Sequence, residues 1–224
     1  RMRKVTRRDF LKLSGAAAAA GLLAGSSGCA ALKPSVSREE VLKVYPDAPS
    51  SKVVRTVHPG AWKGEDLVPD ILRQMLDTSI AELTGLKKAR AAWSLLFSPE
   101  EKVAIKTNAI RGGATHPALV MALTDCLQDA GVPAEQIFVF DRNTYELEVE
   151  GYPVNVDGPG VRCYGNGENW GDPGNYTAGW TLLDTDIKLC DILLDCDALI
   201  NVPILKHSGP GISFGMKNHY GTFD

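Results

Sequence analysis

Lysine, histidine and asparagine side chains gather in one short stretch of the sequence, residues 201–221. Two lysines and two histidines lie on either side of a Ser-Gly-Pro-Gly turn: Lys206, His207, Lys217 and His219. A lysine supplies a positive charge with three N–H donors, and a histidine exchanges a proton near neutral pH. The residue types and their spacing therefore predict a site for an anionic ligand, with proton transfer as the available chemistry.

Other polar residues follow apolar runs that are typical of strands, at 102–108, 137–141 and 198–205. The carboxyl ends of parallel strands meet at one edge of a sheet, where ligands bind. We therefore expect Lys106, His116, Lys206, His207, Lys217 and His219 to face one crevice. The predicted catalytic residues are Lys106, Lys206, His207, Lys217 and His219. The predicted cofactor-binding residues are Asn108, His116, Asp141, Asn201, Ser208, Gly209, Gly211 and Asn218.

The elements that must position these residues alternate between strand and helix. Residues 53–57 form a short β-branched run, which predicts a first strand. Apolar residues at helical spacing predict helices over 67–83, ended by Gly85, over 87–97, and over 118–130 between Pro117 and Gly131. A strand, helix, strand order implies parallel pairing. The predicted fold is α/β, a mostly parallel sheet with helices on both faces.

A glycine-rich excursion interrupts this alternation at residues 157–179, which hold seven glycines. It is either an exposed loop or a substrate lid. Gly165-Asn166-Gly167 predicts a tight hairpin turn with 161–164 as one arm, and it lacks the strand and helix context of a dinucleotide fingerprint. Further on, five aspartates predict the solvated face of a helix: Asp184, Asp186, Asp191, Asp195 and Asp197.

The N-terminal residues have the character of an export address. Thr-Arg-Arg-Asp-Phe-Leu-Lys at 6–12, followed by the apolar run 13–24, resembles the twin-arginine signal, whose machinery carries folded proteins. We expect a signal peptide at 1–31, a linker at 32–51 and an α/β domain at 52–224. Two cleavage sites compete. Ser-Ser-Gly-Cys at 26–29 resembles a lipobox with Cys29 as the lipidated residue, and the alternative is ordinary cleavage among the small residues up to Ala31.

The charge of the body excludes one class of partner. The first 12 residues hold six of the 24 Lys+Arg and one of the 27 Asp+Glu, which leaves 18 basic and 26 acidic residues, a formal charge of −8. An acidic body without a basic stripe argues against nucleic-acid binding. Beyond Cys29, four cysteines remain, with no iron-sulfur spacing: Cys126, Cys163, Cys190 and Cys196. We expect Cys126 and Cys190 to be buried thiols, whereas Cys196 could form a disulfide.

The C-terminal segment also resembles a known family. Asn201-x-Pro-x-x-Lys206, here with His207 directly after the lysine, and Gly215-x-Lys217-Asn218-x-x-Gly221 are similar to the signature of the domain of unknown function 362. Val-Ala-Ile-Lys-Thr-Asn at 103–108, His-Pro at 116–117 and Val-Phe-Asp-Arg at 139–142 add to the resemblance. It implies no agreed reaction. Some members of the family have an added iron-sulfur module, whose cysteines are absent here, and the chain resembles a C-terminally truncated member.

Two classes of function follow from these patterns. In the first, the protein is an exported enzyme that binds an anionic substrate, a metal or a metal-bearing cofactor for redox or proton-transfer chemistry. Its layout loosely resembles that of nickel-cofactor lactate racemases, without a residue-by-residue match. In the second, it is a non-catalytic lipoprotein that holds an anion or metal in the cell envelope. Either protein would use the twin-arginine export machinery and contact the membrane only through the signal or a lipid anchor.

Overall fold

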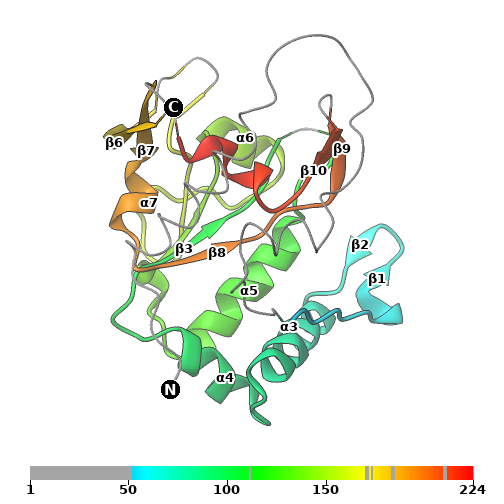
Figure 1. The fold of residues 1–224 in the computed structure, drawn as a ribbon. Helices are drawn as coiled ribbons and strands as arrows, with labels where there is room; N and C mark the ends of the chain where they lie inside the picture. Colours follow the sequence, from blue (N-terminus) through cyan, green and yellow to red (C-terminus); the bar gives the residue numbers. More distant parts are fainter. Residues whose placement is uncertain are drawn as a thin grey trace, which may run out of the picture. The chain divides into compact units, whose positions relative to one another are not determined.

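A four-stranded parallel sheet forms the centre of the domain (Figure 1). The computed structural model describes residues 52–110, 112–169, 172, 174–182, 185–208 and 211–223. The sheet has the order β5 (Arg162–Cys163), β4 (Ile137–Phe140), β3 (Val103–Lys106) and β8 (Ala198–Asn201). All three pairings are parallel. The predicted α/β class is therefore confirmed.

The direction of chain progress reverses in the middle of this sheet. From β3 the chain steps outward to β4 and then β5, and it later returns to place β8 on the opposite side of β3. Open α/β sheets bind ligands beyond the carboxyl ends of the strands, at the point where the strand order reverses. Here that point lies between the ends of β3 and β8, where Lys106 is paired in register with Asn201.

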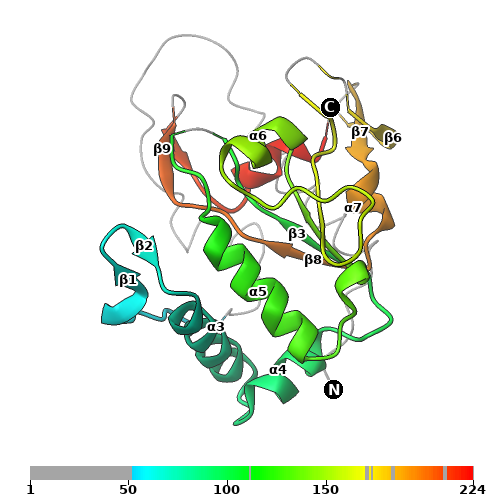
Figure 2. The ribbon, with the colours of Figure 1, turned by 180° about the vertical axis from the view of Figure 1, so that it is seen from behind.

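Three helices cover one face of the sheet: α3 (Pro69–Thr84), α4 (Ala89–Leu96) and α5 (Pro117–Asp129). Figures 1 and 2 show α5 lying along the sheet, with α3 and α4 packed beside it. Val103, Ile105 and Val139 face the main apolar core, together with residues of α5. The predicted helices are confirmed, as is the stop at Gly85, whose φ of 75° is the left-handed conformation that glycine adopts at helix ends.

The opposite face carries a smaller core. Ala104 and Phe140 point to this side, because side chains alternate along a strand, and they pack with Cys190 and Cys196. The cover consists of the antiparallel hairpin β6 (Tyr176–Leu182) and β7 (Thr185–Cys190), followed by the short helix α7 (Asp191–Asp195). Cys126 and Cys190 are buried free thiols, as predicted, and Cys163 and Cys196 are also buried. Burial raises the pKa of the Cys190 thiol to about 11.

The remaining elements are short. Before the sheet lie η1 (Pro59–Ala61) and the pair β1 (Trp62–Lys63) and β2 (Asp66–Leu67), and η2 (Ala134–Gln136) precedes β4. The helix α6 (Thr144–Val149) follows β4 directly. After β8 come the antiparallel pair β9 (Lys206–Ser208) and β10 (Gly211–Ser213) and the turn η3 (Lys217–Gly221). None of the described helices is long and apolar enough to cross a membrane.

Three local predictions are wrong. Residues 53–57 form no strand: Val53 and Val57 are 86% and 69% exposed, and a β-branched run needs a partner strand to pair. The segment 161–164 is no hairpin arm, since β5 pairs in parallel with β4. Asp186 lies in β7 and not on a helix. Gly209, Asp184 and the whole of 1–51, including Cys29, lie outside the described residues.

Candidate active site at the carboxyl edge of the sheet

The last residue of β3 and the first residue after β4 form a buried ion pair. Lys106 Nζ donates to Asp141 Oδ1 at 2.6 Å and to the Thr107 carbonyl at 2.8 Å. The two side chains are 1% and 3% exposed. Asp141 also accepts from two backbone N–H groups, those of Ala109 at 2.5 Å and Arg142 at 2.7 Å. The carboxylate therefore joins the ends of β3 and β4 and offsets the buried lysine charge.

Three asparagine side chains connect this pair to the signature turn. Asn218 of η3 donates through Nδ2 to the Lys106 carbonyl at 3.1 Å and to Asn201 Oδ1 at 2.8 Å. Its Oδ1 accepts from Asn108 Nδ2 at 3.2 Å. Asn201 in turn donates to the Gly215 carbonyl at 2.8 Å. The C-terminal segment is thus fastened over the point where the strand order reverses.

Lys206, the first residue of β9, points toward the segment that follows β3. Its ammonium donates to Asn108 Oδ1 at 2.8 Å and to the carbonyls of Ile110 at 3.0 Å and Gly113 at 2.8 Å. These three acceptors are neutral and use all three of its N–H donors. Burial lowers the pKa of Lys206, and its charge is held by the carbonyls that shape the loop 108–113.

A second buried chain of hydrogen bonds supports the same loop. Tyr152 OH lies 2.5 Å from Thr107 Oγ1 and donates to the Thr115 carbonyl at 2.6 Å. Thr115 Oγ1 reaches the Val202 carbonyl just beyond β8 at 2.9 Å. Burial raises the pKa of the Tyr152 phenol well above its ordinary value, so it is a neutral donor. These three residues could not be brought together from the sequence, because 45 positions separate Thr107 from Tyr152.

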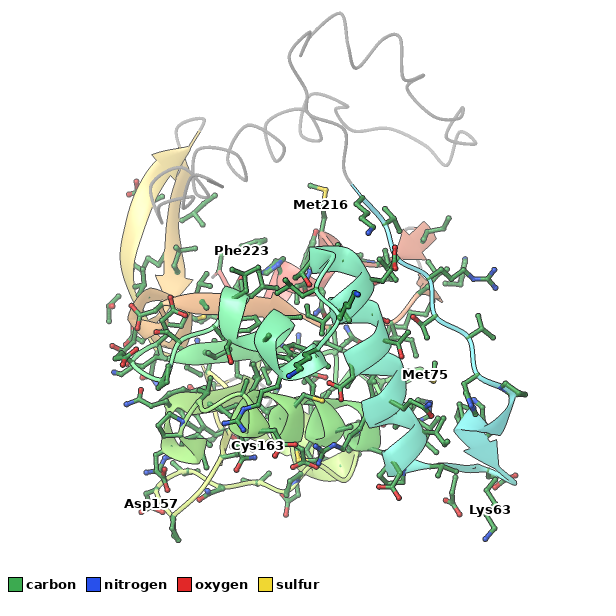
Figure 3. All side chains as sticks on the ribbon, turned by 90° about the horizontal axis from the view of Figure 1, so that it is seen from below. Lys63, Met75, Asp157, Cys163, Met216 and Phe223 are labelled. Atoms are coloured by element: carbon green, nitrogen blue, oxygen red, sulfur yellow. The ribbon has the colours of Figure 1, made fainter. Side chains whose placement is uncertain are left out.

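The turn η3 presents the remaining basic residues of the signature. Lys217 and His219 are half-buried on this turn. Burial, with a smaller effect of the nearby Lys106 charge, lowers the pKa of His219, so its imidazole is neutral at pH 7. Met216, directly before η3, is 71% exposed and projects outward from the ribbon (Figure 3).

Two of the predicted histidines have no hydrogen bond to these residues among the described contacts. His207 is exposed on β9, opposite Ile212 of β10. His116 precedes α5 and packs its ring against Trp62 in an edge-on contact, with the ring centres 5.2 Å apart. Ser208 and Gly211 pair at the end of the β9 and β10 hairpin. Hydrogen bonds therefore connect six of the predicted residues: Lys106, Asn108, Asp141, Asn201, Lys206 and Asn218.

The structure adds an arginine and a glutamate that sequence reasoning missed. Arg142 follows Asp141, and its guanidinium hydrogen-bonds the carboxylate of Glu146 in α6. The helix begins at Asn143, whose Oδ1 accepts from the Glu146 N–H at 2.8 Å. Asparagine followed three residues later by glutamate is a helix-start signature. The spacing from Asn143 to Glu146 therefore predicts the start of a helix, and this start places Glu146 on its first turn, near Arg142.

A large cavity of the described domain is separate from the residues at the end of β3. It has a volume of about 580 Å³, and its wall includes Tyr164, Glu168, Asp191 and Asp195. No residue of the Lys106 and Asn218 hydrogen-bond network lines it. Over the described parts of the chain, no group of three His, Cys, Asp or Glu residues is placed to hold a metal ion.

Comparison with known families identifies the class of protein. The model of the domain of unknown function DUF362 matches residues 103–224, more than half of the chain. The match covers β3, β4, β8, both halves of the signature and every residue of the hydrogen-bond network described above. The chain belongs to the DUF362 family.

The comparison also identifies the N-terminal address. Residues 4–24 match the signal sequence of the twin-arginine translocation pathway. This confirms the twin-arginine prediction and marks an exported protein that is handled by that machinery. A search of curated proteins found no match.

Proposed function

We propose that this protein is an exported enzyme that binds an anionic substrate, or a metal-bearing cofactor with anionic groups, at the carboxyl edge of its sheet. The observation behind the proposal is a reversal of charge. Residues 198–223 contain two lysines and two histidines and no aspartate or glutamate, whereas the body beyond residue 12 has a formal charge of −8. A local positive field attracts an anion to the edge where ligands of such sheets bind.

The basic residues divide into two roles in this proposal. Lys106 and Lys206 are held by internal acceptors, so they position the ends of β3 and the loop 108–113. Lys217 and His219 lie on η3 on either side of Asn218 and are half-buried, and in this proposal they are the groups that contact a ligand. A neutral His219 imidazole can accept a proton from a substrate held by Lys217, which suits proton-transfer chemistry.

The described residues suit the anionic part of a cofactor better than its metal. A protein-bound metal would need several oxygen, nitrogen or sulfur ligands in one place, and the described residues contain no such group of three. Lysine and backbone N–H groups instead recognise carboxylate or phosphate groups. In this proposal the cofactor supplies the redox chemistry when bound, while Lys217 orients it and His219 exchanges the proton.

The alternative is a non-catalytic lipoprotein that holds an anion or metal in the envelope, attached through Cys29 at the periplasmic side or the outer face of the membrane. Its ligand site would have the same charge, so binding alone does not separate the two functions. An enzyme would consume a substrate or hold a redox-active cofactor at stoichiometric amounts. A binding lipoprotein would release its ligand unchanged.

The test compares Lys217→Ala with Lys63→Ala, an exposed lysine on β1 outside the signature turn. The full-length protein is purified from the cytoplasm, where it folds before export, and is examined by native mass spectrometry, elemental analysis and titration with inorganic phosphate and acetate. We expect Lys217→Ala alone to lose the co-purified ligand or to bind the probes roughly tenfold more weakly, because one charge-assisted contact is removed. Equal binding by both variants would overturn the proposed site.

A further inference from the structure

The segment that carries the signature turn leaves large apolar side chains in contact with solvent. Five such residues lie between positions 205 and 220, and each has more than half of its surface exposed: Leu205, Ile212, Phe214, Met216 and Tyr220. Figure 3 shows Met216 projecting outward from the ribbon. Exposed apolar residues gathered on one part of a surface mark a contact with another molecule or with a membrane. The placement of these residues and the charge around them indicate which partner fits.

Strand alternation places part of this set on one side of the β9 and β10 hairpin. Ser213 is buried, whereas Ile212 and Phe214 on either side of it are exposed. Ser213 pairs with Lys206, whose ammonium reaches inward to Asn108 Oδ1 at 2.8 Å. Because successive side chains of a strand point to opposite faces, Ile212 and Phe214 point away from the buried hydrogen-bond network.

Backbone hydrogen bonds join these exposed residues to the turn η3. The Phe214 carbonyl accepts from the Asn218 N–H at 3.0 Å, and the Met216 carbonyl accepts from the His219 N–H at 3.2 Å. The Asn218 side chain is buried and donates to the Lys106 carbonyl at 3.1 Å. The apolar side chains are therefore presented on a backbone that is fastened to the end of β3, which limits the entropy lost when they contact a partner.

Positive charge accompanies these apolar residues. Residues 198–223 contain two lysines and two histidines and no aspartate or glutamate, and Lys217 directly follows the exposed Met216. The body beyond residue 12 has a formal charge of −8, so an anionic surface attracts this segment and repels the rest of the domain. A second copy of the chain would bring the same positive charges together, which disfavours an interface between copies. Apolar and basic side chains in one place are the combination that binds an anionic membrane surface.

We propose that one face of this segment docks on an anionic phospholipid membrane. This outer face is formed by Leu205, Ile212, Phe214, Met216 and Tyr220. In the docked arrangement Ile212, Phe214 and Met216 enter the headgroup layer, and the positive charge of the segment attracts the lipid phosphates. The match of residues 4–24 to a twin-arginine signal means that the protein meets a phospholipid membrane during export. Docking goes beyond the proposed function, because it requires neither a soluble ligand nor a reaction.

The test compares two double variants of the full-length chain. Ile212→Ser with Met216→Ser removes apolar surface from the outer face, and Val53→Ser with Val57→Ser removes exposed apolar surface elsewhere. Each protein is mixed with vesicles of phosphatidylcholine alone or of equal parts phosphatidylcholine and phosphatidylglycerol, and the bound fraction is measured by sedimentation. We expect the outer-face variant to bind the anionic vesicles roughly tenfold more weakly than the wild type and the control, because two apolar side chains no longer leave water. All three proteins should share one unfolding midpoint, since the changed positions are exposed.

Hydrogen exchange separates this contact from binding through the export signal, which all three proteins share. Addition of anionic vesicles should slow backbone exchange in residues 211–220 of the wild type and leave exchange in residues 53–57 unchanged. Added salt should weaken the binding, because it screens the attraction to the lipid phosphates.

Three results would overturn the proposal: equal vesicle binding by the two double variants, unchanged exchange in residues 211–220, or equal binding of the wild type to neutral and anionic vesicles. If the outer-face variant instead changes the oligomeric state of the protein without vesicles, this face is an interface between copies and not a membrane contact. Slower exchange in residues 211–220, together with weaker binding by the outer-face variant alone, supports docking on the membrane.

Discussion

β3 has a lysine at each end, and the two lysines form ion pairs of equal length in very different surroundings. Lys102, directly before the strand, lies 2.6 Å from Asp195, and the two side chains are 39% and 67% exposed. Lys106, the last residue of the strand, lies 2.6 Å from Asp141, and they are 1% and 3% exposed. In water the first pair contributes little, whereas in the second each charge depends on the other for its solvation. The contact distance therefore does not indicate how much an ion pair contributes to stability, because that contribution depends on how deeply the pair is buried.

The surroundings of the two pairs differ in a second way. Lys102 and Asp195 line the open cavity of about 580 Å³. The Lys106 pair is instead surrounded by hydrogen bonds to the segment that follows β3 and to Asn218 of η3. This cavity and the hydrogen-bonded residues at the end of β3 are thus in different places. The hydrogen-bonded residues, and not the residues lining the cavity, include Asn201, Lys206 and Asn218 of the C-terminal motif.

The largest expected effect comes from breaking the buried pair. Asp141→Ala leaves the Lys106 ammonium without its counter-charge and should lower the free energy of unfolding by about 3–5 kcal/mol. Asp195→Ala, at the exposed pair, should lower it by less than about 1 kcal/mol. Chemical denaturation of the two variants gives the comparison. If Asp141→Ala is too unstable to purify, the paired replacement Lys106→Met with Asp141→Asn, which removes both charges and keeps an acceptor for the Ala109 and Arg142 N–H groups, should recover part of the stability. Equal losses from the two single variants would contradict the distinction.

A smaller effect is expected at Asn218, which links the buried end of β3 to the signature turn. Asn218→Ala removes three side-chain hydrogen bonds and leaves the Lys106 carbonyl and the Asn108 amide with fewer partners. Leaving a buried polar group unsatisfied costs about 1–3 kcal/mol. Thermal unfolding of Asn218→Ala should show this loss, while Asn169→Ala, an exposed asparagine, should not. A stable Asn218→Ala variant with wild-type hydrogen exchange in η3 would show that the turn is held by other contacts.

The smallest effect concerns the pH dependence of stability through His219. Burial and Lys106 lower its pKa in the folded protein below the unfolded value of about 6.5. The unfolded chain therefore binds the proton more readily, and stability present above about pH 6.5 is lost as the pH falls below it. The half-buried ring is partly screened by solvent, so we expect a difference of less than about 1 kcal/mol. His219→Gln should unfold with a flatter dependence between pH 5 and 7.5 than His207→Gln, its exposed control. Identical profiles would exclude His219 as the source.

Much of the fold could be predicted because the central elements have strong local signals. The strands β3, β4 and β8 are continuous apolar runs, and α5 lies between a proline and a glycine. Residues 53–57 have the same β-branched composition and form no strand, since pairing depends on a neighbour that the sequence does not reveal. The hairpin of β6 and β7 was missed because its aspartates resembled the polar face of a helix.

The site was predictable only where a residue follows a strong strand. Lys106, Asp141 and Asn201 could be placed at one edge from the strand ends alone, and the signature turn suggested Asn218. The partners of these residues could not be predicted in the same way. Arg142 and Glu146 precede and occupy a six-residue helix, which is too short to show helical periodicity. The contacts of Tyr152 join segments that no local pattern connects.

The strand order of the sheet also determines when, during synthesis of the chain, the hydrogen bonds of the site can form. β8 and η3 complete the edge beside β3, yet Asn108 and Asn218 are 110 positions apart in the chain. During synthesis the export signal at residues 4–24 is made first, and the hydrogen bonds that close the site become possible only after residue 218 has been added. Pairing over such a separation is slow, because a long loop must be ordered before its contacts form. For a pathway that carries folded proteins, a chain in which Asn218 has not yet made these hydrogen bonds would present its export signal on a domain whose site is still incomplete.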